Sequence, residues 1–155
     1  MTEQPLTDDV PGDAQSPDTA PAIGRALDLW NNRLGREFGP LSRRQRRALL
    51  TLHDLSVSRP TVRVSDMADR LGVTSAGATR MLSKLEESGY ISRSRQPEGD
   101  QREVFIGLTE AGSQALRQAN EVYFERVGQA LSALGAEDQA LLARLLDKLT
   151  NDNDR

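Results

Sequence analysis

The fold is decided by residues 64–91, VSDMADRLGVTSAGATRMLSKLEESGYI, which predict two short helices joined by a tight turn. In the first helix Ser65 acts as the N-cap, and apolar side chains recur at helical spacing. Gly72 follows where a left-handed residue usually ends a helix, and Thr74 caps the next helix shortly afterwards. That second helix covers about residues 75–88. Two short helices around a glycine-containing turn predict a helix-turn-helix.

Residues 90–108 predict a β-hairpin directly after the second helix. A short strand runs from Tyr90 to Arg95, and a turn-rich segment follows it, Gln96-Pro97-Glu98-Gly99-Asp100. Residues 102–108 then alternate apolar and polar side chains, as a strand with one buried face does. A helix-turn-helix followed by such a hairpin, called a wing, predicts a winged helix.

Helices are predicted on both sides of this unit. Residues 20–38 repeat apolar side chains at helical spacing up to Gly39-Pro40, and a helix with a Ser42–Gln45 capping box follows. A long helix is expected after Thr109, with an inward face of Ala115, Leu116, Ala119, Val122, Tyr123, Val127, Ala130 and Leu134. A last helix with a wide leucine stripe follows the turn around Gly135.

The apolar stripes of the terminal helices have no obvious partner in a small winged core. Packing within the chain would bury them in part, and a homodimer would bury them more completely. We therefore predict a mainly α fold with a small β wing. Its winged helix-turn-helix, at residues 41–109, is flanked by dimerisation helices at residues 20–40 and 110–155.

The formal net charge of −3 is the sum of unlike segments. Residues 1–19 hold five acidic and no basic side chains, together with three prolines, and predict a disordered acidic tail. Residues 41–109 hold 12 basic against 8 acidic side chains. Four of the basic residues bracket the first turns of a helix, where cations oppose the helix dipole: Arg43, Arg44, Arg46 and Arg47. A solvated face or ion pairs with a partner is the preferred interpretation of this run, and contact with phosphates is the alternative.

Composition excludes several function classes. The chain has no cysteine, which removes disulfides, thiolate metal sites and thiol redox switches, and its single histidine, His53, removes a histidine-cluster metal site. Because there is no glycine-rich phosphate loop, histidine pair or nucleophile elbow, we predict no enzyme, no catalytic residues and no cofactor. No apolar run approaches the length of a membrane span and no signal peptide is visible, so a soluble, cytoplasmic protein is expected.

Three segments carry a resemblance to a known family. They are VSDMADRLGV at residues 64–73, TRMLSKLEESGYI at residues 79–91, and Asp100-Gln101-Arg102 followed by LTEAG at residues 108–112. In this order and spacing they resemble the multiple antibiotic resistance regulator (MarR) family of bacterial transcription factors. The first is similar to the family's initial recognition-unit helix and turn, the second to its recognition helix, and the third to its wing signature. The resemblance implies a winged-helix protein that binds double-stranded DNA.

The resemblance also implies roles for the helix at residues 75–88, because the recognition helix of such proteins lies in the major groove. Ser75 and Thr79 would hydrogen-bond base edges or phosphates, and Arg80 would make a bidentate contact to guanine or a phosphate. Ser83 and Lys84 would hold backbone phosphates without reading sequence. The alternative for all five is an ordinary solvated face.

Two positions depart from the family pattern. Gly77 stands where the family often has a polar or β-branched residue, and its expected use is close approach of the backbone to DNA. Gln101 stands where the family usually has an arginine, which removes one charge that would reach a phosphate.

In the wing, the resemblance implies that Asp100 steadies Arg102, whose guanidinium enters the minor groove. Arg93 and Arg95 share a face of the first wing strand and would contact the flanking DNA backbone, with the stronger claim for Arg95. An exposed salt bridge within the hairpin is the alternative for these wing residues.

Together these observations predict a regulator that binds a pseudo-palindromic operator as a homodimer. A repressor is preferred over an activator, and the resemblance implies a small aromatic or phenolic effector. No effector residue is assigned; four residues could border such a site, namely Trp30, Arg33, His53 and Arg63, but Trp30 is more typical of a core and His53 of a structural histidine. The alternative is a winged-helix module for protein contacts without sequence-specific DNA binding, which would need an apolar exposed face on the helix at residues 75–88.

Overall fold

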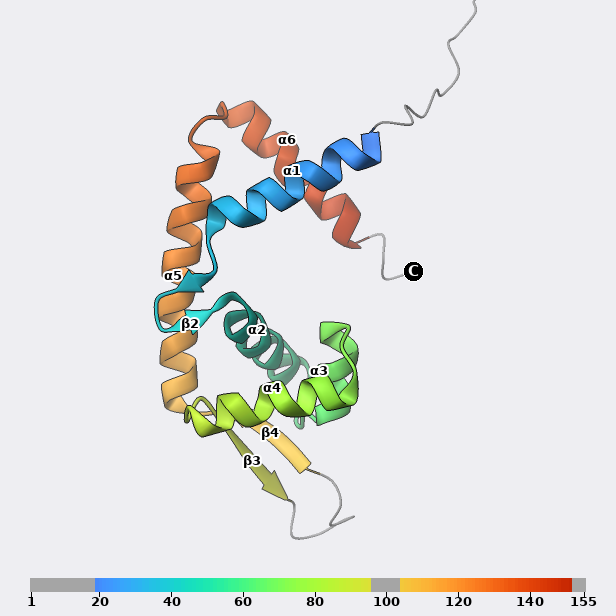
Figure 1. Cartoon of the computed structure of the whole chain (residues 1–155), viewed down its shortest axis with the longest axis vertical. Coiled ribbons are helices and arrows are strands. Elements are labelled where there is room, and N and C mark those ends of the chain that lie inside the picture. Colours follow the sequence, from blue (N-terminus) through green and yellow to red (C-terminus); the bar gives the residue numbers. More distant parts are fainter. Residues whose placement is uncertain (1–18, 96–103, 152–155) are drawn as a thin grey trace, which may run out of the picture. The chain divides into compact units, whose positions relative to one another are not determined.

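The computed structural model describes residues 19–95 and 104–151, which are mainly helical (Figure 1). The elements in chain order are α1 (Thr19–Leu34), β1 (Glu37–Phe38), β2 (Leu41–Ser42), α2 (Arg43–Ser58), α3 (Val64–Leu71), α4 (Ser75–Glu87), β3 (Ile91–Arg95), β4 (Val104–Leu108), α5 (Glu110–Leu131) and α6 (Ala136–Asn151). The predicted mainly α fold with a small β wing is confirmed. The chain divides into two units, Met1–Arg33 and Leu34–Arg155. The predicted acidic tail lies outside the described residues except for Thr19.

α1 is shorter than the sequence predicts. The expected helix at residues 20–38 ends at Leu34, because Gly35 adopts a left-handed φ of 82°. Arg126 of α5 holds this reversal by donating a hydrogen bond to the Leu34 carbonyl oxygen at 2.9 Å. Phe38 lies in the β1–β2 hairpin instead of the helix and is fully buried. The helical spacing of Phe38 is therefore misleading, since this residue belongs to the core of the second unit.

Side-chain caps set the starts of α2 and α3. The predicted capping box of α2 forms, with the Ser42 N–H donating to Gln45 Oε1 at 3.0 Å. α3 begins earlier than predicted, because Arg63 rather than Ser65 is its N-cap residue. The Arg63 N–H donates to a carboxylate oxygen of Asp66 at 2.8 Å, which satisfies one of the free amides at the start of the helix.

The turn between α3 and α4 follows the predicted geometry. Gly72 ends α3 with a left-handed φ of 66°, and Thr74 Oγ1 accepts a hydrogen bond from the Gly77 N–H at 3.1 Å in the first turn of α4. The apolar faces of α2, α3 and α4 meet in one core that includes Leu49, Leu52, Met67, Leu82 and Leu85. Each large side chain that is fully buried contributes about 1.5–3 kcal/mol, so the three helices pack as one unit.

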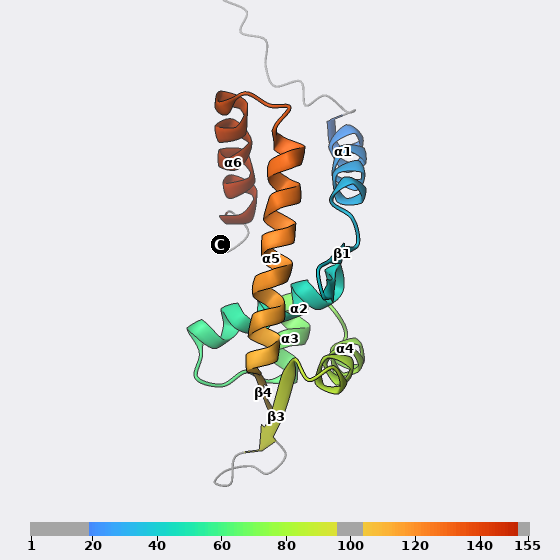
Figure 2. The ribbon, with the colours of Figure 1, turned by 90° about the vertical axis from the view of Figure 1, so that its left-hand side faces the viewer.

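The wing is an antiparallel pair in which Ile91 lies opposite Leu108 and Arg95 lies opposite Val104. The Ile106 N–H donates to the Val62 carbonyl oxygen at 2.9 Å, which ties β4 to the segment before α3. Figure 2 shows the hairpin extending away from the first turns of α5, with α4 on one side of it. The tip of the wing, residues 96–103, lies outside the described residues.

α5 has fully buried side chains in its first half only. Ala115, Leu116 and Ala119 are buried as predicted, but the rest of the expected inward face is at most half-covered, and Leu134 is exposed. The last helix, α6, exposes four leucines: Leu141, Leu145, Leu146 and Leu149. Among the described residues, no helix combines the length and apolarity needed to cross a membrane.

Candidate nucleic-acid interface

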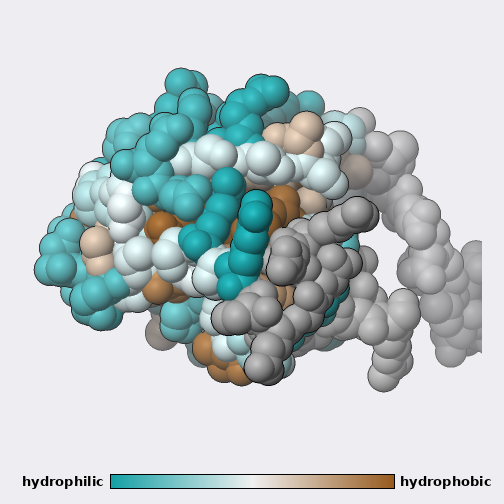
Figure 3. All heavy atoms as spheres, turned by 90° about the horizontal axis from the view of Figure 1, so that it is seen from below, coloured by the Kyte–Doolittle hydropathy of each residue, from teal (hydrophilic) through white to brown (hydrophobic). Residues whose placement is uncertain are grey.

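One face of α4 is polar, basic and open to solvent. Five of the residues predicted to bind DNA lie on it, four exposed and one half-buried: Ser75, Thr79, Arg80 and Lys84, and Ser83. The opposite face is buried and apolar, with Ala78, Leu82 and Leu85. Figure 3 views the side on which α4 and the wing lie, and hydrophilic side chains form several large patches there, with smaller hydrophobic areas between them. Side chains of this kind suit base edges and phosphates.

Gly77 has a role inside the protein as well as a predicted one toward DNA. It is half-buried in the first turn of α4, where its N–H donates to Thr74 Oγ1. A Cβ at this position would lie 3.2 Å from the same oxygen, tighter than most contacts of a real Cβ. The absence of a side chain thus keeps the cap of α4 undisturbed.

The structure describes only part of the predicted wing site. Arg95 is exposed at the end of β3, where the wing leads toward its tip. Asp100 and Arg102 lie outside the described residues, so their roles stay predictions.

Arg93 contacts α4 rather than standing free for the DNA backbone. Its Nη2 donates to the Thr79 carbonyl oxygen at 3.4 Å and to Ser83 Oγ at 3.3 Å, and its Nη1 lies 3.4 Å from Glu86 Oε2. The Arg93 Nε is buried and has no hydrogen-bond partner among the described residues. These contacts brace β3 against α4, so Arg93 sets the position of the wing relative to the helix.

Two of the four arginines at the start of α2 serve the fold. Arg43 donates to the Gly35 carbonyl oxygen at 2.6 Å. The guanidinium of Arg46 lies 3.8 Å from the centre of the Tyr123 ring and donates to Asn120 Oδ1 at 2.9 Å. Burial lowers the pKa of Arg46, and the nearby Tyr123 opposes that shift. The interpretation of the run as a solvated face is wrong for these two residues.

The other two arginines, Arg44 and Arg47, are exposed and line a groove of about 680 Å³ between the start of α2 and α4. Arg80 and Lys84 lie on its other side, and none of the described residues that line it is acidic. The Arg47 Nη2 donates to the Leu71 carbonyl oxygen at 3.2 Å, which directs this guanidinium toward the end of α3. Sequence reasoning missed the groove, because its two basic sides are brought together only by the packing of α2 against the helix-turn-helix.

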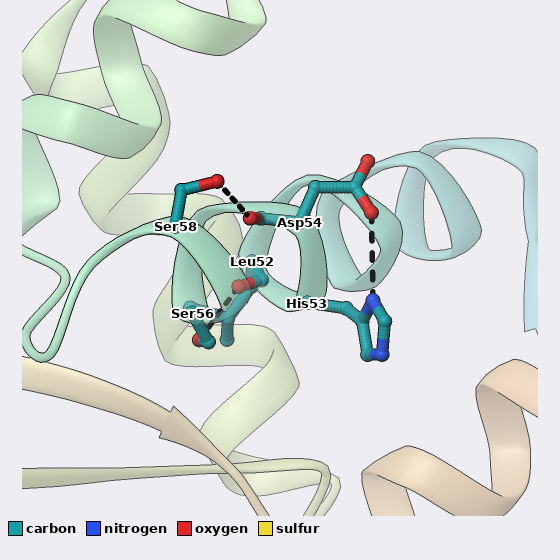
Figure 4. Close-up of polar contacts among 5 residues, drawn as sticks. All are labelled: Leu52, His53, Asp54, Ser56 and Ser58. Carbon is teal, nitrogen blue, oxygen red and sulfur yellow. Dashed lines mark hydrogen bonds and ion pairs between the residues drawn. The ribbon is translucent and has the colours of Figure 1, made fainter.

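His53 does not pack into the core. Its side chain is 56% exposed, and its Nδ1 lies 3.4 Å from Asp54 Oδ1 (Figure 4). The same view shows that Ser56 and Ser58 donate to backbone carbonyls one turn earlier in α2. The structural-histidine interpretation is therefore wrong. Of the other residues considered for an effector, Trp30 is half-buried on α1.

Comparison with known proteins agrees with this geometry. Residues 41–104 match the model of the MarR family. Among curated proteins, the uncharacterized HTH-type transcriptional regulator YkoM of Bacillus subtilis (strain 168) is 30% identical over 95 residues, which cover 61% of this chain and 61% of that protein. The chain spans about half to three fifths of the length of the curated relatives that it matches.

Solved structures share the fold. The reduced form of MarR from E. coli is similar with a TM-score of 0.69 and 25% identity, over 82% of this chain and 95% of that chain. A mutant MarR from E. coli complexed with operator DNA is similar with a TM-score of 0.67 and 23% identity, over 85% of this chain and 96% of that chain.

Proposed function

We propose that the chain is a transcriptional regulator of the MarR family, whose model its residues 41–104 match, and that it binds double-stranded DNA with α4 and the wing. The observation that carries this proposal is the division of α4 into a buried apolar face and an exposed polar, basic face. An α-helix fits the major groove, where Arg, Ser and Thr bond base edges and phosphates. The neighbour from E. coli that was solved in complex with operator DNA has the same fold, which supports DNA binding by this chain.

Arg80 is the residue we assign to base recognition. It is exposed near the middle of the polar face, and its side chain makes no hydrogen bond or ion pair within residues 19–95 and 104–151, so its guanidinium donors are available to a guanine edge or a phosphate. Ser75 and Thr79 would contact bases or phosphates beside it. Lys84 and Arg95 would hold the flanking backbone. The predicted pair of Asp100 and Arg102 would bring the wing tip into the minor groove.

We extend the proposal to a homodimer because α6 exposes a leucine stripe. Leu145 is 48% exposed and Leu149 is 71% exposed, and a second copy would remove both from water. A dimer presents two recognition helices to a pseudo-palindromic operator about one helical turn apart. A small aromatic or phenolic effector would release the DNA if it favoured a dimer with a different separation of the two recognition helices. In this proposal the protein is a cytoplasmic repressor.

The experiment that tests the proposal is selection of genomic fragments by the purified protein, followed by fluorescence anisotropy on the enriched sequence. Loss of a bidentate base contact costs about 1–3 kcal/mol, so Arg80→Ala should weaken binding about 5- to 150-fold at fixed salt. Arg117→Ala is the matched control, because Arg117 is an exposed arginine on α5. Wild-type affinity in the Arg80→Ala protein would refute the docking of α4. Failure to enrich any fragment would favour the protein-interaction alternative.

A further inference from the structure

We propose that Arg44 and Arg47 bind backbone phosphates beside the major groove, so that α2 contributes a basic surface to the DNA interface in addition to α4 and the wing. This inference rests on the proposed function. For these two arginines it takes up the alternative of phosphate contact in place of the preferred interpretation of a solvated face or ion pairs with a partner. The residues that carry it lie on both sides of the groove between the start of α2 and α4.

The groove holds an unbalanced positive charge. Arg44 and Arg47 stand on its α2 side, Arg80 and Lys84 stand on its α4 side, and within residues 19–95 and 104–151 no Asp or Glu lines it. Within the described ranges, the side chains of Arg44, Arg80 and Lys84 make no hydrogen bond or ion pair. Arg47 uses one donor on the Leu71 carbonyl and keeps the rest of its guanidinium available. Four cations around one open groove suit a ligand with several negative charges.

The position of these arginines on α2 strengthens the argument. The first turn of α2 has no acidic residue, and the positive end of the helix dipole adds to the field of the arginines. These positive charges destabilise the isolated helix, because they lie at the positive end of its dipole, where negative charges would stabilise it. A phosphate that binds at this turn would meet both the guanidinium groups and the positive end of the dipole.

DNA backbone is the occupant that the groove fits, because two of its cations belong to the face of α4 that we assign to the major groove. When a recognition helix enters the major groove of DNA, one phosphate backbone runs along each side of the helix. The wing lies on one side of α4 and would contact the DNA backbone there. Arg44 and Arg47 lie on a different side of α4, where they would contact the other backbone. Phosphates repeat along the duplex at about one charge per 1.7 Å of axis, which matches several separate cations better than one small anion does.

Salt dependence of binding to a labelled duplex of random sequence tests the inference, because such binding is almost entirely electrostatic. The slope of log affinity against log salt concentration is negative, and each lost phosphate contact makes it shallower by about 0.9. Arg44→Gln/Arg47→Gln should therefore make it shallower by about 1.8. Between about 50 and 200 mM salt, wild-type affinity should then fall about 12-fold more than the affinity of the variant. The matched control is Arg117→Gln/Arg144→Gln, which removes two exposed arginines from α5 and α6.

The outcomes separate this inference from the proposed function. An unchanged slope in the Arg44/Arg47 variant, while the wild-type protein binds DNA, overturns the inference and leaves the proposed function intact. A shallower slope in the control variant as well overturns it too, because net charge would then explain the effect. No DNA binding by the wild-type protein refutes the proposed function itself.

Two further measurements guard against other causes. Arg44→Gln alone should reduce the steepness of the salt dependence by about half as much. The Arg44 side chain makes no hydrogen bond or ion pair within the described residues, so we expect this variant to fold like the wild type. The ranking of operator sequences by affinity should be the same for the variant and the wild-type protein, because phosphate contacts carry no sequence information. A changed ranking would contradict the assignment to phosphates.

Discussion

Gly112→Ala should destabilise the protein, although alanine is the better helix former. Gly112 is buried in the first turn of α5, and a Cβ there would run into the Tyr90 carbonyl group, coming within 2.8 Å of its carbon atom. That carbonyl cannot move aside freely, because its oxygen accepts the Thr109 N–H at 3.1 Å and the Tyr90 N–H donates to Leu85 at 2.9 Å. The clash is therefore with held backbone at the base of the wing.

The expected size follows from three opposing effects. Replacing glycine inside a helix favours the folded state by about 1 kcal/mol. Forcing an extra methyl group into a packed site costs about 1–3 kcal/mol, and weakening the bond between Thr109 and Tyr90 costs about 0.5–1.5 kcal/mol. The net expectation is a loss of about 2 kcal/mol in the free energy of unfolding.

Gly128→Ala is the matched control on the same helix. Gly128 is exposed, and a Cβ there would meet no atom within 4 Å. We expect this variant to gain up to about 1 kcal/mol from helix propensity alone. Urea denaturation followed by circular dichroism, at one protein concentration, measures both variants. A Gly112→Ala protein at least as stable as the wild type would refute the reasoning.

Two more perturbations test the wing brace and the dimer. Arg93→Met keeps the aliphatic part of the side chain but removes its polar contacts to α4. Because the ion pair with Glu86 is partly exposed, we expect the free energy of unfolding, measured by urea denaturation, to fall by only about 1 kcal/mol. Operator binding should also weaken, and an unchanged operator affinity would contradict a positioning role for Arg93. Leu145→Asp on α6 should shift the protein from dimer to monomer in light scattering, because a carboxylate would have to be buried in the interface. Arg144→Asp is the control, because Arg144 is exposed on the same helix. A dimer that survives Leu145→Asp would refute the proposed interface.

The recognition unit could be predicted because its signals are local. Gly72 needs a left-handed conformation, and Thr74 caps the helix within its own first turn, so both effects depend on residues a few positions apart. The same holds for the Ser42–Gln45 capping box. Once the ends of α4 are known, helical spacing alone separates its buried face from the exposed face that holds Arg80.

The structure predicted from the sequence is wrong where a residue far away in the chain decides the local conformation. Phe38 continues the apolar spacing of α1, but Gly35 ends the helix and Arg126, far along the chain, bonds the carbonyl of Leu34. The expected burial of the second half of α5 fails for a related reason. Periodicity shows which face of a helix is apolar, but it does not show how far a packing partner extends along that face.

The sequence by itself determined the order of the helices and of the wing strands, the helix-turn-helix and the residues that α4 turns to solvent, because caps, turns and helical period act over short distances. Only the tertiary structure decided the fate of the arginine run at the start of α2. Successive residues of a helix point about 100° apart, so neighbours in sequence meet different surroundings. Arg46 stacks on Tyr123 of α5, while Arg44 and Arg47 face the cations of α4 across a groove that exists only after the helices pack.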